Sequence, residues 1–172
     1  MHTLSGDLTK SRVNQNLLAG FWAQLKMNKN WTAQTELLLI DKGIGGTIAG
    51  NKSPHWVNLH YFEVPFLFQY HQKKMYYEFG PGLAYLINCA EHLYGNNSPD
   101  LKFKYPFAKN EISFNLGIGC TLNEYWSFEF RLNHSLLPVR AAVPTISKAS
   151  YNRLLAFSVT RLLKKKNKSD AQ

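Results

Sequence analysis

Apolar and polar residues alternate along most of this chain, which is the pattern of a β-strand whose two faces meet different surroundings. The clearest example lies between residues 127 and 136, where Phe128, Phe130 and Leu132 share one face and polar or charged residues share the other. Helical periodicity is weak throughout. Seven segments show the alternation: 17–26, 31–40, 61–70, 76–87, 112–122, 127–136 and 151–163. The sequence therefore predicts an all-β fold with seven strands.

The connections between these strands fall into two classes that alternate strictly. Short turns are expected at about 27–30, 71–74 and 122–125, and long loops at about 41–56, 88–110 and 138–150. A soluble sandwich gives no reason for this order, whereas a bacterial membrane barrel has short periplasmic turns and longer extracellular loops. The pattern favours an antiparallel up-and-down transmembrane β-barrel of the eight-stranded type, with seven strands present in this chain.

The composition of the two faces indicates which one points inward. In a membrane barrel the apolar face meets lipid and the polar face fills the lumen, the reverse of a soluble barrel or sandwich, which would show the same alternation. The polar face is rich in glycine, as a narrow eight-stranded interior requires. It also carries a predicted lumenal polar network: Glu36, Glu63, Glu78, Glu129 and Arg131. The predicted lipid-facing residues are Phe62, Val64, Phe66, Phe68, Phe79, Leu83, Phe114, Leu116, Phe128, Phe130 and Phe157.

Two prolines, Pro65 and Pro81, fall in the middle of predicted strands, where proline removes a hydrogen-bond donor from the ladder. We expect local bulges at these positions. Aromatic residues also gather near the strand ends, with Trp31 and Trp126 beside short turns and Trp56 beside a long loop. This distribution is typical of the two interfacial girdles of a membrane barrel.

The net charge of the chain is +9. On a soluble protein such a charge would suggest nucleic acid as a partner. On a membrane barrel it suggests the phosphate-rich lipid of the outer leaflet, and a basic surface without a specific partner is equally compatible. No stretch approaches the ~18–20 apolar residues of a membrane helix. The predicted partners are therefore outer-membrane lipid and unidentified extracellular or periplasmic proteins, with no nucleic acid.

Several motifs resemble a known family. The segment Tyr61-Phe62-Glu63-Val64-Pro65-Phe66-Leu67 is similar to one strand of the outer-membrane β-barrel domain family, often labelled porin-family or PorT-like. The segments 77–82, 116–119, 128–133 and 151–153 resemble later strands of the same family, in the same order. The resemblance covers about Leu18 to Leu163 and includes both prolines. It implies an eight-stranded barrel in the outer membrane of a Gram-negative bacterium, with a mostly unassigned function.

The chain divides by pattern into a loop remnant over 1–13, the barrel domain over 14–163 and a basic tail over 164–172. Residues 1–13 show no alternation. Because bacterial single-chain barrels have an even number of strands, we expect the eighth strand upstream of Met1, after a signal peptide, or else a strand from another subunit.

Candidate chemistry is sparse. The six histidines show no metal-ligand spacing with Cys, Asp or Glu, and the Gly43–Gly46 stretch lacks the Lys-Ser/Thr of a phosphate loop. We therefore predict no catalytic residue, metal or cofactor. The lumenal charges are interpreted as a structural ion-pair network. The expected function is a structural or binding barrel, and the alternatives are a small channel, a secretion-associated barrel or a lipid-active outer-membrane enzyme.

The predicted facing of the strand 61–70 can be tested by substitution. Val64→Arg places a charge near the middle of the bilayer and should lower the free energy of unfolding in lipid by about 2–4 kcal/mol. Gln69→Arg, on the lumenal face, should cost less. A refolding titration in vesicles measures both, and an equal or reversed order would rule out the facing.

Overall fold

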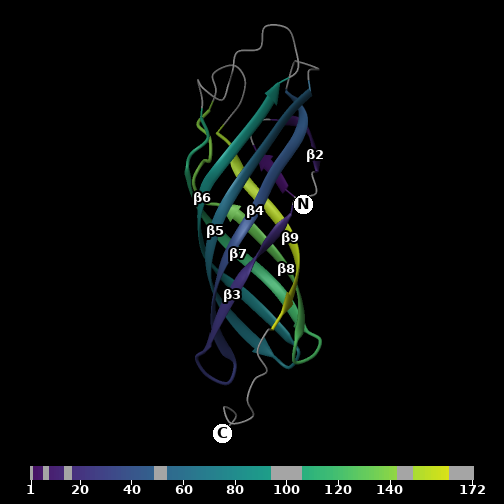
Figure 1. Cartoon of the computed structure of the whole chain (residues 1–172), viewed down its shortest axis with the longest axis vertical. Coiled ribbons are helices and arrows are strands. Elements are labelled where there is room, and N and C mark those ends of the chain that lie inside the picture. The colour runs from purple at the N-terminus through teal and green to yellow at the C-terminus, as the bar shows by residue number, and fades with distance from the viewer. Residues whose placement is uncertain are drawn as a thin grey trace.

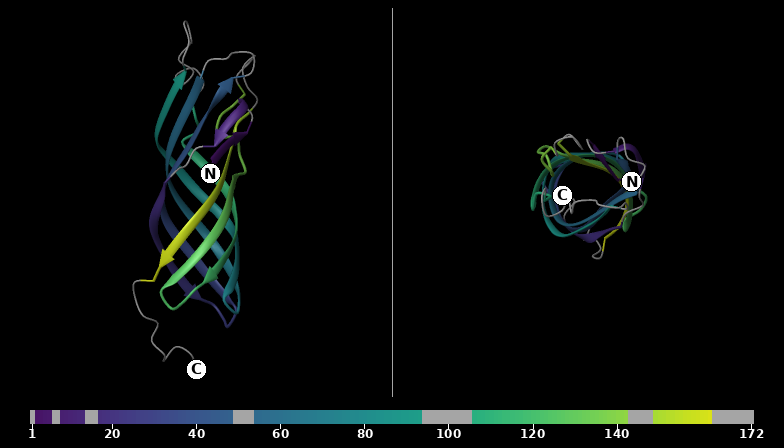
Figure 2. Two further views of the ribbon diagram at one scale, coloured as in Figure 1. Left: turned by 90° about the vertical axis from the view of Figure 1, so that its right-hand side faces the viewer. Right: turned by 90° about the horizontal axis from the view of Figure 1, so that it is seen from above.

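In the part of the chain that the structure describes, nine strands form one antiparallel sheet that curves into an elongated barrel (Figures 1 and 2). This computed structural model describes residues 2–5, 8–13, 17–48, 54–93, 106–142 and 149–162. The strands are β1 (His2–Ser5), β2 (Leu8–Val13), β3 (Leu18–Lys26), β4 (Trp31–Ile48), β5 (Pro54–Gln72), β6 (Met75–Leu93), β7 (Asn110–Thr121), β8 (Trp126–Ser135) and β9 (Tyr151–Arg161). No helix in these ranges is long and apolar enough to cross a membrane.

The seven predicted strands are β3 to β9, and each is antiparallel to the next along the chain. This confirms the predicted all-β, up-and-down architecture. The three short turns lie together at the lower end of the barrel in Figure 1. This is expected because short and long connections alternate along the chain, and successive connections of an antiparallel meander lie at opposite ends. The upper end carries the connections that follow β4, β6 and β8.

The expectation of a loop over residues 1–13 is wrong, because that segment contains β1 and β2. The strand β1 pairs with the upper part of β9, and β2 pairs with the upper part of β4, directly above β3. Neither segment alternates in sequence. Their extended form is instead supported by the backbone ladders that they make with two longer strands.

The strands β4, β5 and β6 are 18, 19 and 19 residues long, whereas β7, β8 and β9 have 10 to 12. The long loops expected at 41–56 and 88–110 are therefore partly wrong, because strand structure continues to Ile48, resumes at Pro54 and extends to Leu93. Glycines and polar residues near these strand ends resemble a loop in sequence. The ladders between β4, β5 and β6 nevertheless continue through them.

All eleven residues predicted to face lipid lie on the outside of the barrel. Nine are exposed, and Val64 and Phe128 are half-buried. The residues between them point inward: Glu63, Leu67 and Gln69 on β5 are each 1% exposed. The alternation along the sequence thus corresponds to the two faces of the wall.

Pro65 and Pro81 interrupt their ladders without a bulge, contrary to expectation. Between β5 and β6 the register is the same on both sides of the gap, with Pro65 opposite Gly82 and Phe68 opposite Phe79. The register shift between these strands lies elsewhere, between His60 and Tyr61.

Gly80 explains how the strands stay in register near these prolines. A Cβ atom at this position would lie 1.9 Å from the Phe66 carbonyl oxygen, so only glycine allows the two backbones to approach this closely.

Two of the short turns share one construction. The Oδ1 atom of Asn28 accepts hydrogen bonds from the amides of Asn30 and Trp31, both at 2.9 Å. The Oδ1 atom of Asn123 accepts from Tyr125 and Trp126, at 2.9 and 3.0 Å. Asparagine thus takes the place of a backbone acceptor in each turn.

The role of asparagine in these turns can be tested at Asn123. Asn123→Ala should lower the free energy of unfolding by about 1 kcal/mol, because two turn amides lose their acceptor, whereas Asn123→Asp should retain most of it. Chemical unfolding of the folded barrel in vesicles measures both variants. A loss as large for aspartate as for alanine would contradict this account of the turn.

Candidate functional site: the barrel lumen

The centre of the lumen is occupied by Arg131 and three carboxylates, here called the Arg131 cluster. The guanidinium makes a bidentate pair with Glu36, at 2.6 and 2.7 Å. Its Nε donates to Glu78 Oε1 at 2.6 Å, and its Nη2 lies 2.8 Å from Glu129 Oε1. These side chains come from three strands: Glu36 from β4, Glu78 from β6, and both Glu129 and Arg131 from β8. Planar, multidentate pairing of this kind is what arginine provides and lysine does not.

Amide and phenol groups fill the space around this cluster. Gln69 Nε2 donates to Glu78 Oε2 at 3.0 Å and to Gln34 Oε1 at 3.1 Å, and Gln24 donates to Gln69 at 2.8 Å. The hydroxyl of Tyr76 donates to Glu129 Oε2 at 3.1 Å. Hydrogen bonds therefore satisfy carboxylate oxygens that the single guanidinium does not reach.

A second group of charges lies nearer the upper end and is called the Lys42 cluster: Lys42, Glu63, Glu111 and Asn133. Lys42 Nζ is 2.9 Å from Glu111 Oε1 and 3.3 Å from Glu63 Oε2. The Asn133 amide donates to Glu63 Oε1 at 2.7 Å. Lys42 is 0% exposed, so its charge is held entirely by these partners.

Inward-facing glycines provide the volume that these side chains occupy. A Cβ atom at Gly117 would lie 2.6 Å from Glu78 Oε1, and one at Gly119 would lie 2.0 Å from the Tyr76 ring. At Gly82 it would lie 2.5 Å from the Ser113 hydroxyl. The small residues on one strand are thus matched to large polar residues on the next, as the glycine-rich polar face predicted.

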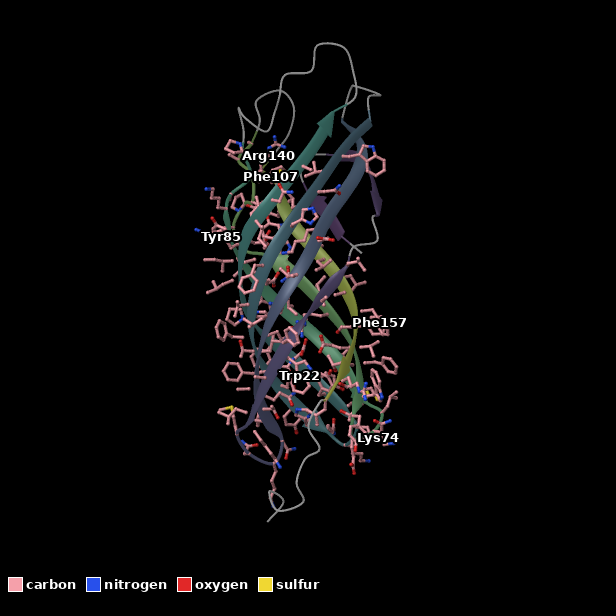
Figure 3. All side chains as sticks on the ribbon, in the orientation of Figure 1. Trp22, Lys74, Tyr85, Phe107, Arg140 and Phe157 are labelled. Carbon is pink, nitrogen blue, oxygen red and sulfur yellow. The ribbon has the colours of Figure 1, made fainter. Side chains whose placement is uncertain are left out.

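An apolar group of buried side chains lies toward the upper end of the lumen. Its members, here called the apolar cap, are Val57, Leu59, Tyr61, Ala84, Phe107 and Val139. Phe107 and Val139 come from the connections before β7 and after β8, and Arg140 stacks over the Phe107 ring at 4.6 Å (Figure 3). The cap lies next to the Lys42 cluster, because Lys42 Nζ is 4.8 Å from the centroid of the Tyr61 ring.

All five residues predicted for the lumenal network point inward, but they do not form one group. Glu36, Glu78 and Glu129 surround Arg131, whereas Glu63 belongs to the Lys42 cluster. Sequence reasoning missed Lys42 and Glu111, which fell in or beside expected loops. Both lie in phase with inward residues of their strands, so extending the alternation past the expected strand ends would have found them.

The chemistry of this lumen is that of paired charges in a closed space. No group of three His, Cys, Asp or Glu side chains in the described ranges is placed to hold a metal ion. His134 lies on the outer side, beside Tyr151 at a ring distance of 6.4 Å. The side chains of Glu91 and His92, an acid–histidine pair adjacent in the sequence, lie outside those described.

Comparison with known proteins gives one family match. The family model described as "Outer membrane protein beta-barrel domain" matches residues 5–140. No curated protein and no solved structure matches the chain.

The Arg131 cluster predicts a large effect of removing its only cation. Arg131→Met leaves three buried carboxylates without their partner and should lower the free energy of unfolding by about 3–5 kcal/mol. Arg153→Met, an exposed arginine on β9, is the matched control and should change stability by less than about 1 kcal/mol.

A second substitution separates charge from packing. Adding Glu36→Gln to Arg131→Met removes one uncompensated carboxylate and should recover part of the loss. Urea unfolding in vesicles measures all four proteins. The cluster would be unimportant for stability if Arg131→Met were as mild as the Arg153 control.

Proposed function

The chain belongs to the outer-membrane β-barrel domain family that its residues 5–140 match, and from this we propose that it acts as a non-conducting barrel that presents a binding surface outside the membrane. The family places it in the outer membrane. The role itself, without catalysis, is our proposal. The likeness of Tyr61–Leu67 to the porin-family or PorT-like strand supports a Gram-negative host.

The observation that carries the proposal is that paired charges and apolar side chains occupy the lumen at three successive levels. The Arg131 cluster, the Lys42 cluster and the apolar cap follow one another from the lower to the upper part of the barrel. An eight-stranded barrel has an interior just wide enough for side chains. A solute or hydrated ion would have to separate two buried ion-pair groups and displace the cap in order to pass.

The outward face supports a lipid environment for the lower part of the barrel. Exposed apolar residues cover β5 to β9, among them Phe66, Leu83, Leu116 and Phe130, which are 47–55% exposed. A patch of this extent on a soluble protein would aggregate. In hydrocarbon the same residues are favourable, and from β4 to β9 the paired strands separate the inward charges from lipid.

A binding surface is supported by the length of β4, β5 and β6. A membrane strand needs about 9–11 residues, and these strands have 18 or 19. The remaining residues raise a sheet above the ends of β7 and β8, as Figure 1 shows. Its outer side exposes Trp56 and Ile87, at 38% and 58%, and Tyr85, at 49%, lies at its base opposite Asn110, a combination typical of protein interfaces. The net charge of +9 supports contact with lipid phosphates as well.

Conductance in planar bilayers tests the proposal directly. The folded protein should give a flat trace without unitary steps. Phe107→Ala, which removes an aromatic ring from the cap but leaves both ion-pair clusters, should also stay flat, because each layer alone blocks the narrow lumen.

Stepwise conductance by the unaltered protein would contradict the proposal and favour the small-channel alternative. Steps in the Phe107→Ala variant alone would show that the cap is the only seal. A large single-chain porin in the same bilayer serves as the positive control for insertion.

A further inference from the structure

The barrel wall has a seam between β3 and β9. In the part of the chain that the structure describes, β3 pairs with β4 only, and from Ala156 to Arg161 β9 pairs with β8 only. Figure 3 shows Trp22 of β3 and Phe157 of β9 on either side of this seam. The two strands are neighbours across the seam without a backbone ladder between them.

The seam exposes both sides of β3. Phe21 and Leu25 are 76% and 71% exposed, against 47% for Phe66 in the middle of the wall. Gly20 and Gln24, which point inward, are exposed too, unlike the inward residues of β5. One side of β3 therefore lacks the neighbour that covers every interior strand of the sheet.

A cavity of about 180 Å³ opens at this position. It is lined by both strands and reaches Glu36, Glu129 and Arg131 of the lumen. In a membrane, two strand edges and a cluster of charges would thus face hydrocarbon, where unpaired backbone amides and carbonyls are not tolerated. Something of matching polarity must cover the seam.

Strand directions identify what fits. Six successive antiparallel pairings lead from β3 to β9, so these two strands run in the same direction. Closing them on each other would create a parallel pair in an otherwise antiparallel barrel. One intervening strand, antiparallel to both, pairs both edges and gives eight strands.

The strand β1 already marks the path of this intervening strand. It runs antiparallel along the upper part of β9, with His2 opposite Leu154, directly above the seam. We propose that the seam binds one extended polypeptide strand, antiparallel to β3 and β9 and in line with β1. This surface is separate from the raised sheet to which we assign the binding role.

The surroundings of the seam define the side chains of the bound strand. Its outward residues lie between Phe21 and Phe157 and should be apolar. Its inward residues face the Arg131 cluster, in which three carboxylates share one guanidinium. They should therefore be small and should donate hydrogen bonds, as serine does, and an acidic residue should be rejected.

Disulfide trapping with a synthetic peptide tests this. The protein carries Val159→Cys on β9 as its only thiol, with Cys89 and Cys120 replaced by serine, and is folded into vesicles. The probe is a peptide of about nine residues that alternates valine and serine, with one cysteine among the valines. Two control peptides are matched to it: in one the serines are replaced by aspartate, and in the other the central valine is replaced by proline.

We expect one peptide per chain and roughly tenfold more linked product than with either control, because proline removes ladder donors and aspartate adds like charge. Equal yields with all three peptides would overturn the proposal. So would a disulfide-linked dimer that excludes the peptide, since a second copy would then fill the seam.

A second variant tests direct closure. The pair Phe21→Cys and Phe157→Cys, whose native residues face one cavity, should not form a disulfide while a strand lies between them. Equal disulfide yields for this pair with and without the peptide would show that β3 and β9 close on each other, and would overturn the proposal. Heat-dependent gel mobility reports the folded fraction of each variant.

Discussion

A strand inside a membrane has no water to bond with, so its backbone amides and carbonyls must pair with another strand on each side. This constraint explains the antiparallel meander from β3 to β9, whose neighbours are joined by short turns at one end. It explains why the ladder passes Pro65 and Pro81 without losing register, since a slip would turn every side chain to the wrong face. It also makes the seam between β3 and β9 the most informative part of the wall, because no backbone ladder among the described residues joins these two strands.

Closing a wall of so few strands leaves a narrow interior, and this determines its contents. Charges taken from water must find partners at close range, and Arg131 does so by dividing its donors among three carboxylates. Lys42 is held in the same way by Glu63 and Glu111. The inward glycines are the complement of these long side chains. Packing and charge pairing are therefore one property of the lumen, which is why we infer a lumen that does not conduct and assign any recognition to the wall and its outer surface.

The phase of the alternation predicted which residues face inward, because a period of two fixes the face of every residue once one is known. It could not predict which inward charges meet, since that depends on the stagger between strands. Glu63 accordingly pairs with Lys42 and not with Arg131. The upper strand ends were missed because Gly43 to Gly46 resemble a loop. The strands β1 and β2 were missed because they have no alternating pattern of their own and are supported by their pairing with β9 and β4. The cap could not be foreseen, since Phe107 enters it from a connection.

The central claim is that the apolar outer face lies in hydrocarbon while the charges are enclosed. The most direct measurement uses Phe66→Trp as the only tryptophan, with Trp22, Trp31, Trp56 and Trp126 replaced by phenylalanine, in vesicles of lipids brominated at different depths. The account predicts strong quenching by bromine near the middle of the acyl chains and little quenching by aqueous iodide. Emission that iodide quenches and brominated lipid leaves unchanged would contradict it.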